Sequence, residues 1–524
     1  MKSFTLFSAF VFIFLSPTNA QSKKFSFTLG EEYELPRKSD DLAFLGNERD
    51  GILNLSLKRE ELTILRFDSK TLNKTNETVI PLPDATKNFL SEGVLDFGSS
   101  YYWIHSDWDK ESGTEMLYYD VIDVASGKLA TTGKKMFETT KLASGGYRKY
   151  TLNQDADKTK LLVSYRLFPE FRNDKVNYDK LGFQVFDDKM NKLWGGEFTM
   201  PYTEAVMDNS DFTVDNNGNA YMLAKVYDSD RRKEVDKETG LPGYHYEVMK
   251  FTKGQKKPTI VRVEVGQNFL KEVSIVENSL HEIIIASTYS KKAKSSGTDG
   301  MFLAILDANG KLANYKKGYY EFPLAELQKF ESSRQRRRME RKDDYEAPNL
   351  HIRNIVVEPT GGVFVTCEEY YSVTRTYYSS NGGSRTTTTY YYEDIIAAKI
   401  NATGEFDWMR KIPKRQRGTS GRGTMSFKMV SDGSGYYFLF LDNLKNMDLA
   451  EDEEPKYHVD GMGGQVVVAK LDNAGALSKE LVFDVRKEDV KIYPADFDRL
   501  SSNQFIGRAR VGRNQYQPLM ITVH

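Results

Sequence analysis

Cysteine is nearly missing from the chain, which has only Cys367 in its 524 residues. A single thiol cannot form an intramolecular disulfide. Because Cys367 lies in the apolar stretch GGVFVTCEEY (361–370), we expect a buried structural thiol rather than a reactive one. The fold must therefore be held by its core alone, which a chain of this length can build.

The chain also lacks an excess of either charge, with 73 basic and 74 acidic residues and a formal net charge of −1. This balance argues against a general nucleic-acid-binding protein, although it permits local charged patches. We therefore expect partners other than nucleic acid.

Long hydrophobic runs are limited to residues 4–15. This run follows Lys2 and precedes the small, turn-prone residues 16–20, which is the pattern of a secretory signal peptide, and it is too short to cross a bilayer as a stable helix. We expect residues 1–20 to be removed, leaving Gln21 at the N-terminus. The mature protein is then expected in the periplasm or the extracellular space, with no membrane span and, since Gln21 is not a cysteine, no lipid anchor there.

Motifs of catalysis and metal binding are missing as well: the chain has no His-Glu-x-x-His, Gly-x-Ser-x-Gly, P-loop or paired-cysteine motif. No two of its six histidines stand at a short metal-ligand spacing, a test that cannot see ligands brought together from distant segments. The stretch DWDKESGTE (107–115) resembles the start of a calcium loop, but Ser112 replaces the required glycine and Tyr118 the closing glutamate. We expect no cofactor and no metal, and the catalytic residues, if there are any, stay unknown.

What the chain does contain is a repeated pattern: an apolar strand that ends in Asp, Asn or Thr, a tight turn with Gly or Lys, and a second strand. It occurs seven times, at 66–79, 121–134, 185–198, 250–263, 305–318, 399–412 and 470–483. Periodic units of this size indicate a repeat architecture.

Two further strands precede each copy, for example DFTV (211–214) followed by NAYMLAKVY (219–227). Four short antiparallel strands per unit, with almost no helix between units, is the blade of a β-propeller. Over nearly all of its mature length the chain resembles a secreted, all-β propeller. The shared motifs are turn motifs, so the resemblance implies a fold and no activity, and it points to no functionally characterised family.

The two ends of the chain bear on the number of blades. After the seventh copy come three strands (491–500, 503–511 and 516–524), while KKFSFTLGEEYEL (23–35) forms a lone strand at the start. Adding that strand to the last three closes the ring and removes an open sheet edge. We therefore favour eight four-stranded blades closed by the N-terminal strand, with seven as the alternative if an early unit is irregular.

The stretch RTYYSSNGGSRTTTTYYYED (375–394) belongs to the sixth blade, between its second and third strands. SNGG is a hairpin turn signal, and the Tyr and Thr runs beside it favour paired strands. We predict a long hairpin at about 370–394. Its role is structural pairing or, alternatively, stacking of a sugar or peptide on Tyr377, Tyr378, Tyr390 or Tyr391.

Loop lengths separate the two faces of the ring. In a blade with strands a to d, the b–c loops and the d-to-a connections emerge on one face, here named the long-loop face. Most of the extra chain falls there, at 106–114, 169–180, 228–244, 320–350, 373–390 and 442–463. Long loops on a rigid scaffold are where binding usually takes place.

Two basic segments reach this face. A helical insertion is expected at about 322–345, and the next connection is 410–422; together they supply Arg334, Arg336, Arg337, Arg338, Arg341, Lys414, Arg415 and Arg417. An acidic stretch follows at 448–460. These charges are solvated or paired with one another, or alternatively the arginines bind the oxygens of an anionic surface, such as an acidic glycan or lipid headgroups.

Two functions remain open. The first is a non-catalytic binding or scaffold propeller of the cell envelope or extracellular space, which contacts a protein, a glycan or an anionic surface through the long-loop face. The second, by analogy of fold alone, is a glycan hydrolase or lyase with its site in the central channel. The enzyme requires a closely spaced carboxylate pair with separated pKa values. The oligomeric state is left open.

Overall fold

The computed structural model describes residues 24–143, 148–263, 265–307, 310–342, 345–378, 383–461 and 463–524. The predicted signal peptide at 1–20 lies outside the described residues. Within them, no helix is long and apolar enough to cross a membrane.

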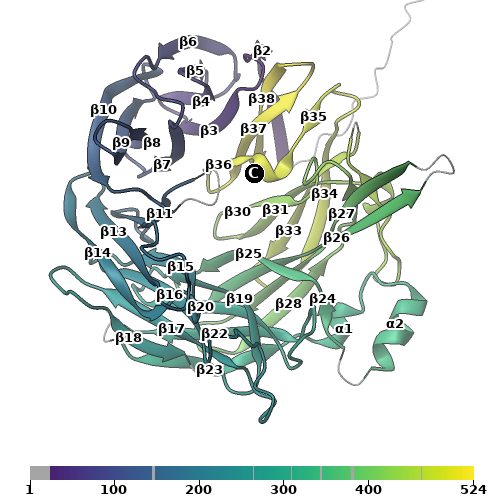
Figure 1. The fold of residues 1–524 in the computed structure, drawn as a ribbon. Helices are drawn as coiled ribbons and strands as arrows, with labels where there is room; N and C mark the ends of the chain where they lie inside the picture. The colour runs from purple at the N-terminus through teal and green to yellow at the C-terminus, as the bar shows by residue number, and fades with distance from the viewer. Residues whose placement is uncertain are drawn as a thin grey trace, which may run out of the picture.

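The described chain forms eight units of four antiparallel strands that follow one another around a ring, as Figure 1 shows. The first four units contain β3 (Asp40–Asn47), β4 (Gly51–Lys58), β5 (Glu61–Phe67) and β6 (Lys74–Pro81); β7 (Leu90–Asp96), β8 (Tyr101–Asp109), β9 (Thr114–Asp123) and β10 (Lys128–Thr139); β11 (Thr151–Gln154), β12 (Lys160–Arg166), β13 (Tyr178–Asp187) and β14 (Lys192–Thr203); and β15 (Met207–Val214), β16 (Ala220–Tyr227), β17 (Tyr244–Phe251) and β18 (Thr259–Val263).

The last four units contain β19 (Phe269–Glu277), β20 (Ile283–Ser290), β22 (Gly300–Leu306) and β23 (Leu312–Glu321); β25 (Leu350–Val357), β26 (Val363–Tyr378), β27 (Ser384–Ile400) and β28 (Phe406–Ile412); β30 (Phe427–Ser431), β31 (Gly435–Asp442), β33 (Gln465–Asp472) and β34 (Leu477–Asp484); and β36 (Asp498–Ser501), β37 (Gln504–Arg510), β38 (Gln515–Val523) and β1 (Phe25–Leu29). The first strand of each unit lies toward the centre of the ring (Figure 1). The all-β propeller prediction is confirmed, and the described units number eight, the favoured count.

The N-terminal strand completes the last unit. β1 pairs antiparallel with β38, from Phe25↔Val523 to Leu29↔Leu519, and the short β2 (Tyr33–Glu34) pairs with β38 farther along. Phe25 is 2% exposed and packs in the core between the seventh and eighth units. Hydrogen bonds and apolar burial thus cover the edge that β38 would otherwise present to solvent.

The core is divided among the interfaces between neighbouring units. The middle strands are buried on both faces and read as continuous apolar runs, as in β31, whereas the outermost β6 alternates between partly buried and exposed residues. Cys367 is 1% exposed in the cluster between the fifth and sixth units, and burial raises its pKa to about 12. The thiol is therefore buried, as expected.

The connections are unequal on the two faces of the ring. The a–b and c–d turns are short throughout, whereas the long-loop face carries segments such as 167–177, 228–243, 322–349, 413–426, 443–464 and 485–497. These segments contain the remaining elements α1 (Leu324–Leu327), α2 (Ser333–Glu340), β24 (Ala347–Pro348), β29 (Gln416–Gly418), η1 (Leu444–Asn446), β32 (His458–Val459), β35 (Lys491–Ile492) and η2 (Pro494–Asp496), while β21 (Gly297–Thr298) lies between β20 and β22 and pairs with β24. The long-loop face is thus where the chain has room to build a site.

Candidate functional site

Helix α2 and its C-terminal end present half of the eight predicted basic residues to solvent. The Ser332 side chain accepts a hydrogen bond from the Gln335 N–H and begins the helix, and the buried Met339 anchors it. Four arginines on this helix and at its end are exposed, namely Arg334, Arg337, Arg338 and Arg341. Arg336 is more buried and reaches the backbone oxygen of Asp452 at 3.4 Å.

The acidic stretch 448–460 pairs with part of this basic surface. Lys329 Nζ lies 2.8 Å from Glu451, and Arg415 Nη1 lies 2.5 Å from Glu454. The guanidinium of Arg415 also stacks on the ring of Tyr457, and the exposed Arg417 lies over the same ring at 4.8 Å. Opposite charges therefore neutralise each other at this place, while the outer arginines of α2 stay in solvent.

Lys414 departs from the predicted binding surface because its side chain is completely buried. Its Nζ lies 2.8 Å from Glu368, and both side chains are 0% exposed. Alternate residues of an extended segment point to opposite sides, so Lys414 and Gln416 face inward while Arg415 and Arg417 face outward. The prediction of a plain loop at 410–422 took no account of alternating sides, and so it placed Lys414 on the binding surface.

The tyrosines of the sixth unit divide into two groups. β26 and β27 pair up to Tyr378↔Ser384, and the turn residues 379–382 lie outside the described part. Tyr391 stacks on Tyr371 across the strands, with ring centroids 4.7 Å apart, and Tyr390 is partly buried. Tyr377 and Tyr378 near the tip are 56% and 84% exposed. The tip tyrosines can thus meet a partner, whereas Tyr391 serves the strand pairing.

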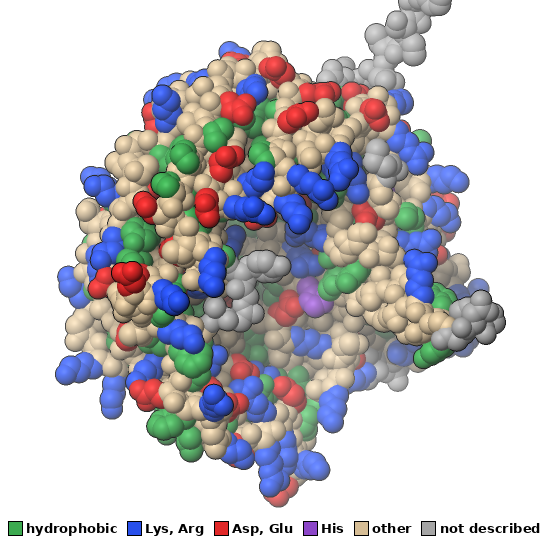
Figure 2. Space-filling model, turned by 45° about the horizontal axis from the view of Figure 1, so that its top comes forward, with side chains coloured by type: hydrophobic (Ala, Val, Ile, Leu, Met, Phe, Trp, Pro, Cys, Tyr) green, Lys and Arg blue, Asp and Glu red, His purple; other side chains and the backbone are tan. Residues whose placement is uncertain are grey.

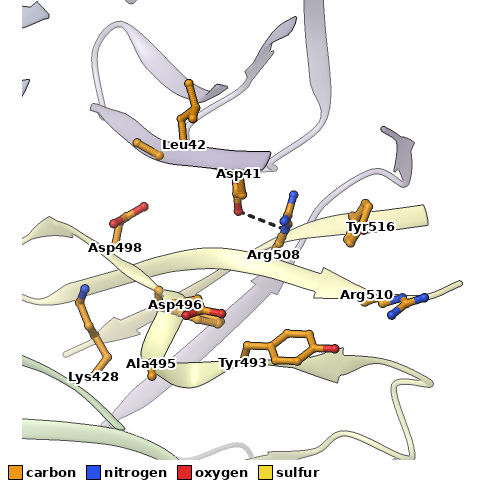
Figure 3. Close-up of a pocket in the computed structure, with 12 residues that line it drawn as sticks. Asp41, Leu42, Lys428, Tyr493, Ala495, Asp496, Asp498, Arg508, Arg510 and Tyr516 are labelled. Carbon is orange, nitrogen blue, oxygen red and sulfur yellow. Dashed lines mark ion pairs between the residues drawn. The ribbon is translucent and has the colours of Figure 1, made fainter. Parts of the chain in front are cut away.

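A cavity of about 600 Å³ lies where the ring closes, between the seventh, eighth and first units. We name it the closure cavity; it is lined by Asp41, Leu42, Ala43, Lys428, Tyr493, Ala495, Asp496, Phe497, Asp498, Arg508, Arg510 and Tyr516 (Figure 3). Lys428 and Asp498 lie toward one end of the view, and Tyr493, Arg510 and Tyr516 toward the other.

The closure cavity opens on the long-loop face at the centre of the ring. Asp41, Lys428 and Asp498 stand at the beginnings of the inner strands β3, β30 and β36, and Arg510 and Tyr516 flank the b–c turn of the eighth unit. Figure 2 shows the molecule hollowed near its centre, with Lys and Arg side chains gathered along one edge of the hollow.

Two carboxyl groups in the closure cavity are tied to its walls. Asp41 lies 3.0 Å from Arg508 Nε and accepts a hydrogen bond from Asn54, and Asp498 accepts one from the Phe44 N–H at 2.8 Å. Burial raises the pKa of Asp41, an effect that Arg508 only partly offsets, and burial likewise raises the pKa of Asp498 against the Phe44 N–H and Lys428.

Other groups in the closure cavity remain open to a ligand. Lys428 is partly exposed and makes no side-chain ion pair in the described structure, and Arg510 is exposed. Asp496 is exposed too, but it forms an ion pair with Arg422. Donors, acceptors and two tyrosine rings therefore meet in one cavity. Among the described residues no group of three His, Cys, Asp or Glu side chains could hold a metal ion.

Sequence reasoning named none of these lining residues. They come from both ends of the chain and follow no local motif, since Asp41 and Asp498 are separated by almost the whole sequence. The predicted closure of the ring by the N-terminal strand was the available signal, because it brings the segments after residue 35 and before residue 516 together.

Comparison with known proteins describes the fold only. No family model and no curated protein matches the chain. Among similar solved structures, the Dos1 propeller shares 11% identity over 54% of this chain and 59% of its own, with a TM-score of 0.31. An acylaminoacyl peptidase from Pyrococcus horikoshii shares 10% identity over 90% of this chain and 55% of its own, with a TM-score of 0.35. An endo-arabinanase from Bacillus licheniformis shares 12% identity over 54% of this chain and 99% of its own, with a TM-score of 0.23. The matched part thus spans little more than half the length of the first two. At this similarity the comparison carries no activity over to this chain.

Proposed function

We propose that the protein is a non-catalytic binding propeller that takes a glycan segment in the closure cavity on its long-loop face. The observation that carries the proposal is the composition of that cavity: carboxylates, cationic groups and two tyrosines converge from three units around about 600 Å³. Pockets in which a few polar groups converge are the usual binding sites of a rigid scaffold.

A hydroxyl-rich ligand suits these groups because each hydroxyl both donates and accepts hydrogen bonds. Asp498 and Asp496, which also pairs with Arg422, offer acceptors. Lys428 and Arg510 offer donors, and the ring of Tyr493 offers an apolar face. The three aspartates of the cavity would repel a purely anionic ligand, and its three basic residues would repel a purely cationic one. A neutral glycan, or one that carries both charges, therefore fits better.

A binding role fits the electrostatics better than hydrolysis does. Glycosidases separate the pKa values of two carboxyl groups so that one donates a proton while the other is ionised. In the closure cavity, burial moves the pKa values of Asp41 and Asp498 in the same direction, upward. Hydrolysis or lysis of the glycan is the alternative.

The exposed arginines of α2 support a second candidate, contact with an anionic surface. In the described structure, no ion pair neutralises Arg334, Arg337, Arg338 or Arg341, and guanidinium groups bind phosphate and carboxylate oxygens in a bidentate manner. This contact is separate from the closure cavity, so the two can be tested apart. Either role takes place in the periplasm or outside the cell if residues 1–20 are the signal peptide.

The test is a binding titration of residues 21–524 against immobilised neutral and acidic glycans. Arg510→Ala and Tyr493→Ala should each weaken binding about tenfold or more, because each removes one direct contact. Arg513→Ala is the matched control, since Arg513 is exposed in the same β37–β38 turn but lies outside the cavity lining. All three variants should melt at the wild-type temperature.

The outcomes separate the candidates. Unchanged glycan affinity in Arg510→Ala and Tyr493→Ala would overturn the closure cavity as the site. If Arg337→Glu together with Arg338→Glu abolishes binding to acidic glycans or anionic vesicles, the α2 surface is the contact instead. Release of new sugar ends by the wild type, lost in Asp498→Asn, would establish the enzyme.

A further inference from the structure

A second cavity of about 590 Å³ lies between the first and second units, also on the long-loop face. It is formed by the end of β6, the connection 82–89, the facing ends of β8 and β9, and the first half of β10. None of its lining residues belongs to the closure cavity. We name it the β8–β9 cavity.

The walls of the β8–β9 cavity are aromatic and apolar. Phe89, Trp108 and Tyr118 line it together with Ile80, Leu82, Met116 and Leu129. Trp108 is only partly buried, and it takes part in none of the ring–ring contacts found in the described structure. Its ring is therefore available to a ligand.

The charges on the lining are all of one sign. Asp84, Asp107, Asp109 and Asp120 line the cavity, and no lysine or arginine does. Hydrogen bonds hold these carboxylates in place: Asp107 accepts from the Thr86 N–H at 2.8 Å, and Asp120 accepts from the Gly133 N–H at 2.5 Å. Hydrogen bonds from Ser112 and the Glu111 N–H lower the pKa of Asp109, so this carboxylate is ionised at neutral pH.

A buried histidine also lines the cavity. His105 lines the cavity, is 8% exposed, and stacks on Tyr118 with ring centroids 5.5 Å apart. Its Nε2 lies 3.3 Å from Asp120 Oδ2, while its Nδ1 has no hydrogen-bond partner in the described structure. The ring of His105 thus belongs to the aromatic wall of the cavity.

From these contacts we propose that the β8–β9 cavity binds a protonated organic amine with an apolar stem. An ammonium group has three donors and no acceptor, which complements a lining of carboxylates. Trp, Tyr and Phe rings attract such a cation through their faces, and the apolar walls cover its stem. A free small amine and a lysine side chain of a partner protein share this chemistry.

Calorimetry with three ligands of equal length tests the proposal: pentylamine, pentanol and pentanoate. Pentylamine should bind at least about tenfold more tightly than pentanol, because the alcohol lacks the charge that pairs with carboxylates and rings. Pentanoate should not bind. Equal affinity for the amine and the alcohol would overturn the proposal, since the site would then be merely apolar.

A blocked lysine amide distinguishes the two sources of the amine. If it binds as tightly as pentylamine, the cavity admits a lysine side chain with its backbone and fits a protein partner. If it binds much more weakly, the cavity fits a free amine. Both results support the amine site.

Variants assign the binding to this cavity. Trp108→Leu should weaken pentylamine binding about tenfold, and Asp84→Asn should weaken it severalfold. Glu111→Gln is the matched control, because Glu111 is exposed in the same β8–β9 turn but does not line the cavity. Wild-type pentylamine affinity in both Trp108→Leu and Asp84→Asn, with unchanged melting, would refute the site.

Discussion

Replacing Lys414 by methionine should destabilise the fold strongly, although the sequence suggested a surface role in binding. The Lys414 ammonium donates to Glu368, to the Tyr392 carbonyl and to the Gln416 side chain, and both Lys414 and Glu368 are fully buried. Removing one partner of a buried ion pair costs about 3–5 kcal/mol, because the remaining charge is left uncompensated. Glu368 would keep its ion pair with Arg353, whose Nε lies 2.9 Å away, and a hydrogen bond from Ser426 Oγ at 2.8 Å. We therefore expect the lower end of the range, about 3 kcal/mol.

Urea unfolding measures this loss, and a double-variant cycle assigns it to the pair. Glu368→Gln added to Lys414→Met should recover part of the free energy of unfolding, because the buried charge that only Arg353 would then offset is gone. Arg417→Met is the matched control: Arg417 lies three residues along the same segment, but it is exposed over Tyr457, so its loss should cost less than about 1 kcal/mol. The reasoning fails if Lys414→Met unfolds at the wild-type urea concentration and instead loses a ligand.

Three further outcomes follow from the fold. Phe25→Ala should lower the free energy of unfolding by about 3–5 kcal/mol in the same urea assay, because the ring is 2% exposed in the core beside the closing strand; a loss under 1 kcal/mol would mean that β1 does not hold the ring. Burial raises the pKa values of Asp41, Asp498 and Glu92. Their protonated forms therefore stabilise the fold fully below about pH 4, and this contribution is lost as the pH rises through the raised pKa values. The melting temperature should fall over this pH range, and it should fall less in Asp498→Asn. Cys367 should react with an aromatic disulfide reagent at neutral pH only after urea unfolds the chain, since burial raises its pKa to about 12; fast labelling of the native protein would contradict its position in the core.

Turn chemistry explains why so much of the fold was predictable. Asp, Asn and Gly in the c–d turns have a local structural reason: Asp187, for example, accepts hydrogen bonds from the N–H groups of Lys189 and Asn191 and so fixes the reversal between β13 and β14. The repeat identifies the third and fourth strands of each unit. The first two strands can then be assigned to the segments between successive copies, and the face on which each connection emerges is known. The closing strand was predictable for the same reason, since three strands at one end and one at the other leave a single economical pairing.

The candidate sites were harder because they depend on which side of a segment faces inward. Gln416 and Lys414 are buried while Arg415 and Arg417 face outward, a difference that composition cannot show for a short strand such as β29. The closure cavity and the β8–β9 cavity are built from segments that are not adjacent in sequence. Their lining residues carry no motif, so they emerge only once the register of the strands is known.

The position of the closure cavity links ligand binding to the integrity of the ring. Its walls come from β3 near the N-terminus and from β30, β36 and β37 near the C-terminus, so a ligand held between them joins the first and last units. A ligand that binds only the folded state adds about 2.7 kcal/mol of stability at a hundred times its Kd. That gain acts where the ligand holds the walls together, and the amides of β3, β36 and β37 should then exchange with solvent more slowly in the presence of glycan. Glycan protection that is confined to another part of the ring would place the ligand elsewhere, because a bound group slows the openings that separate its own contacts.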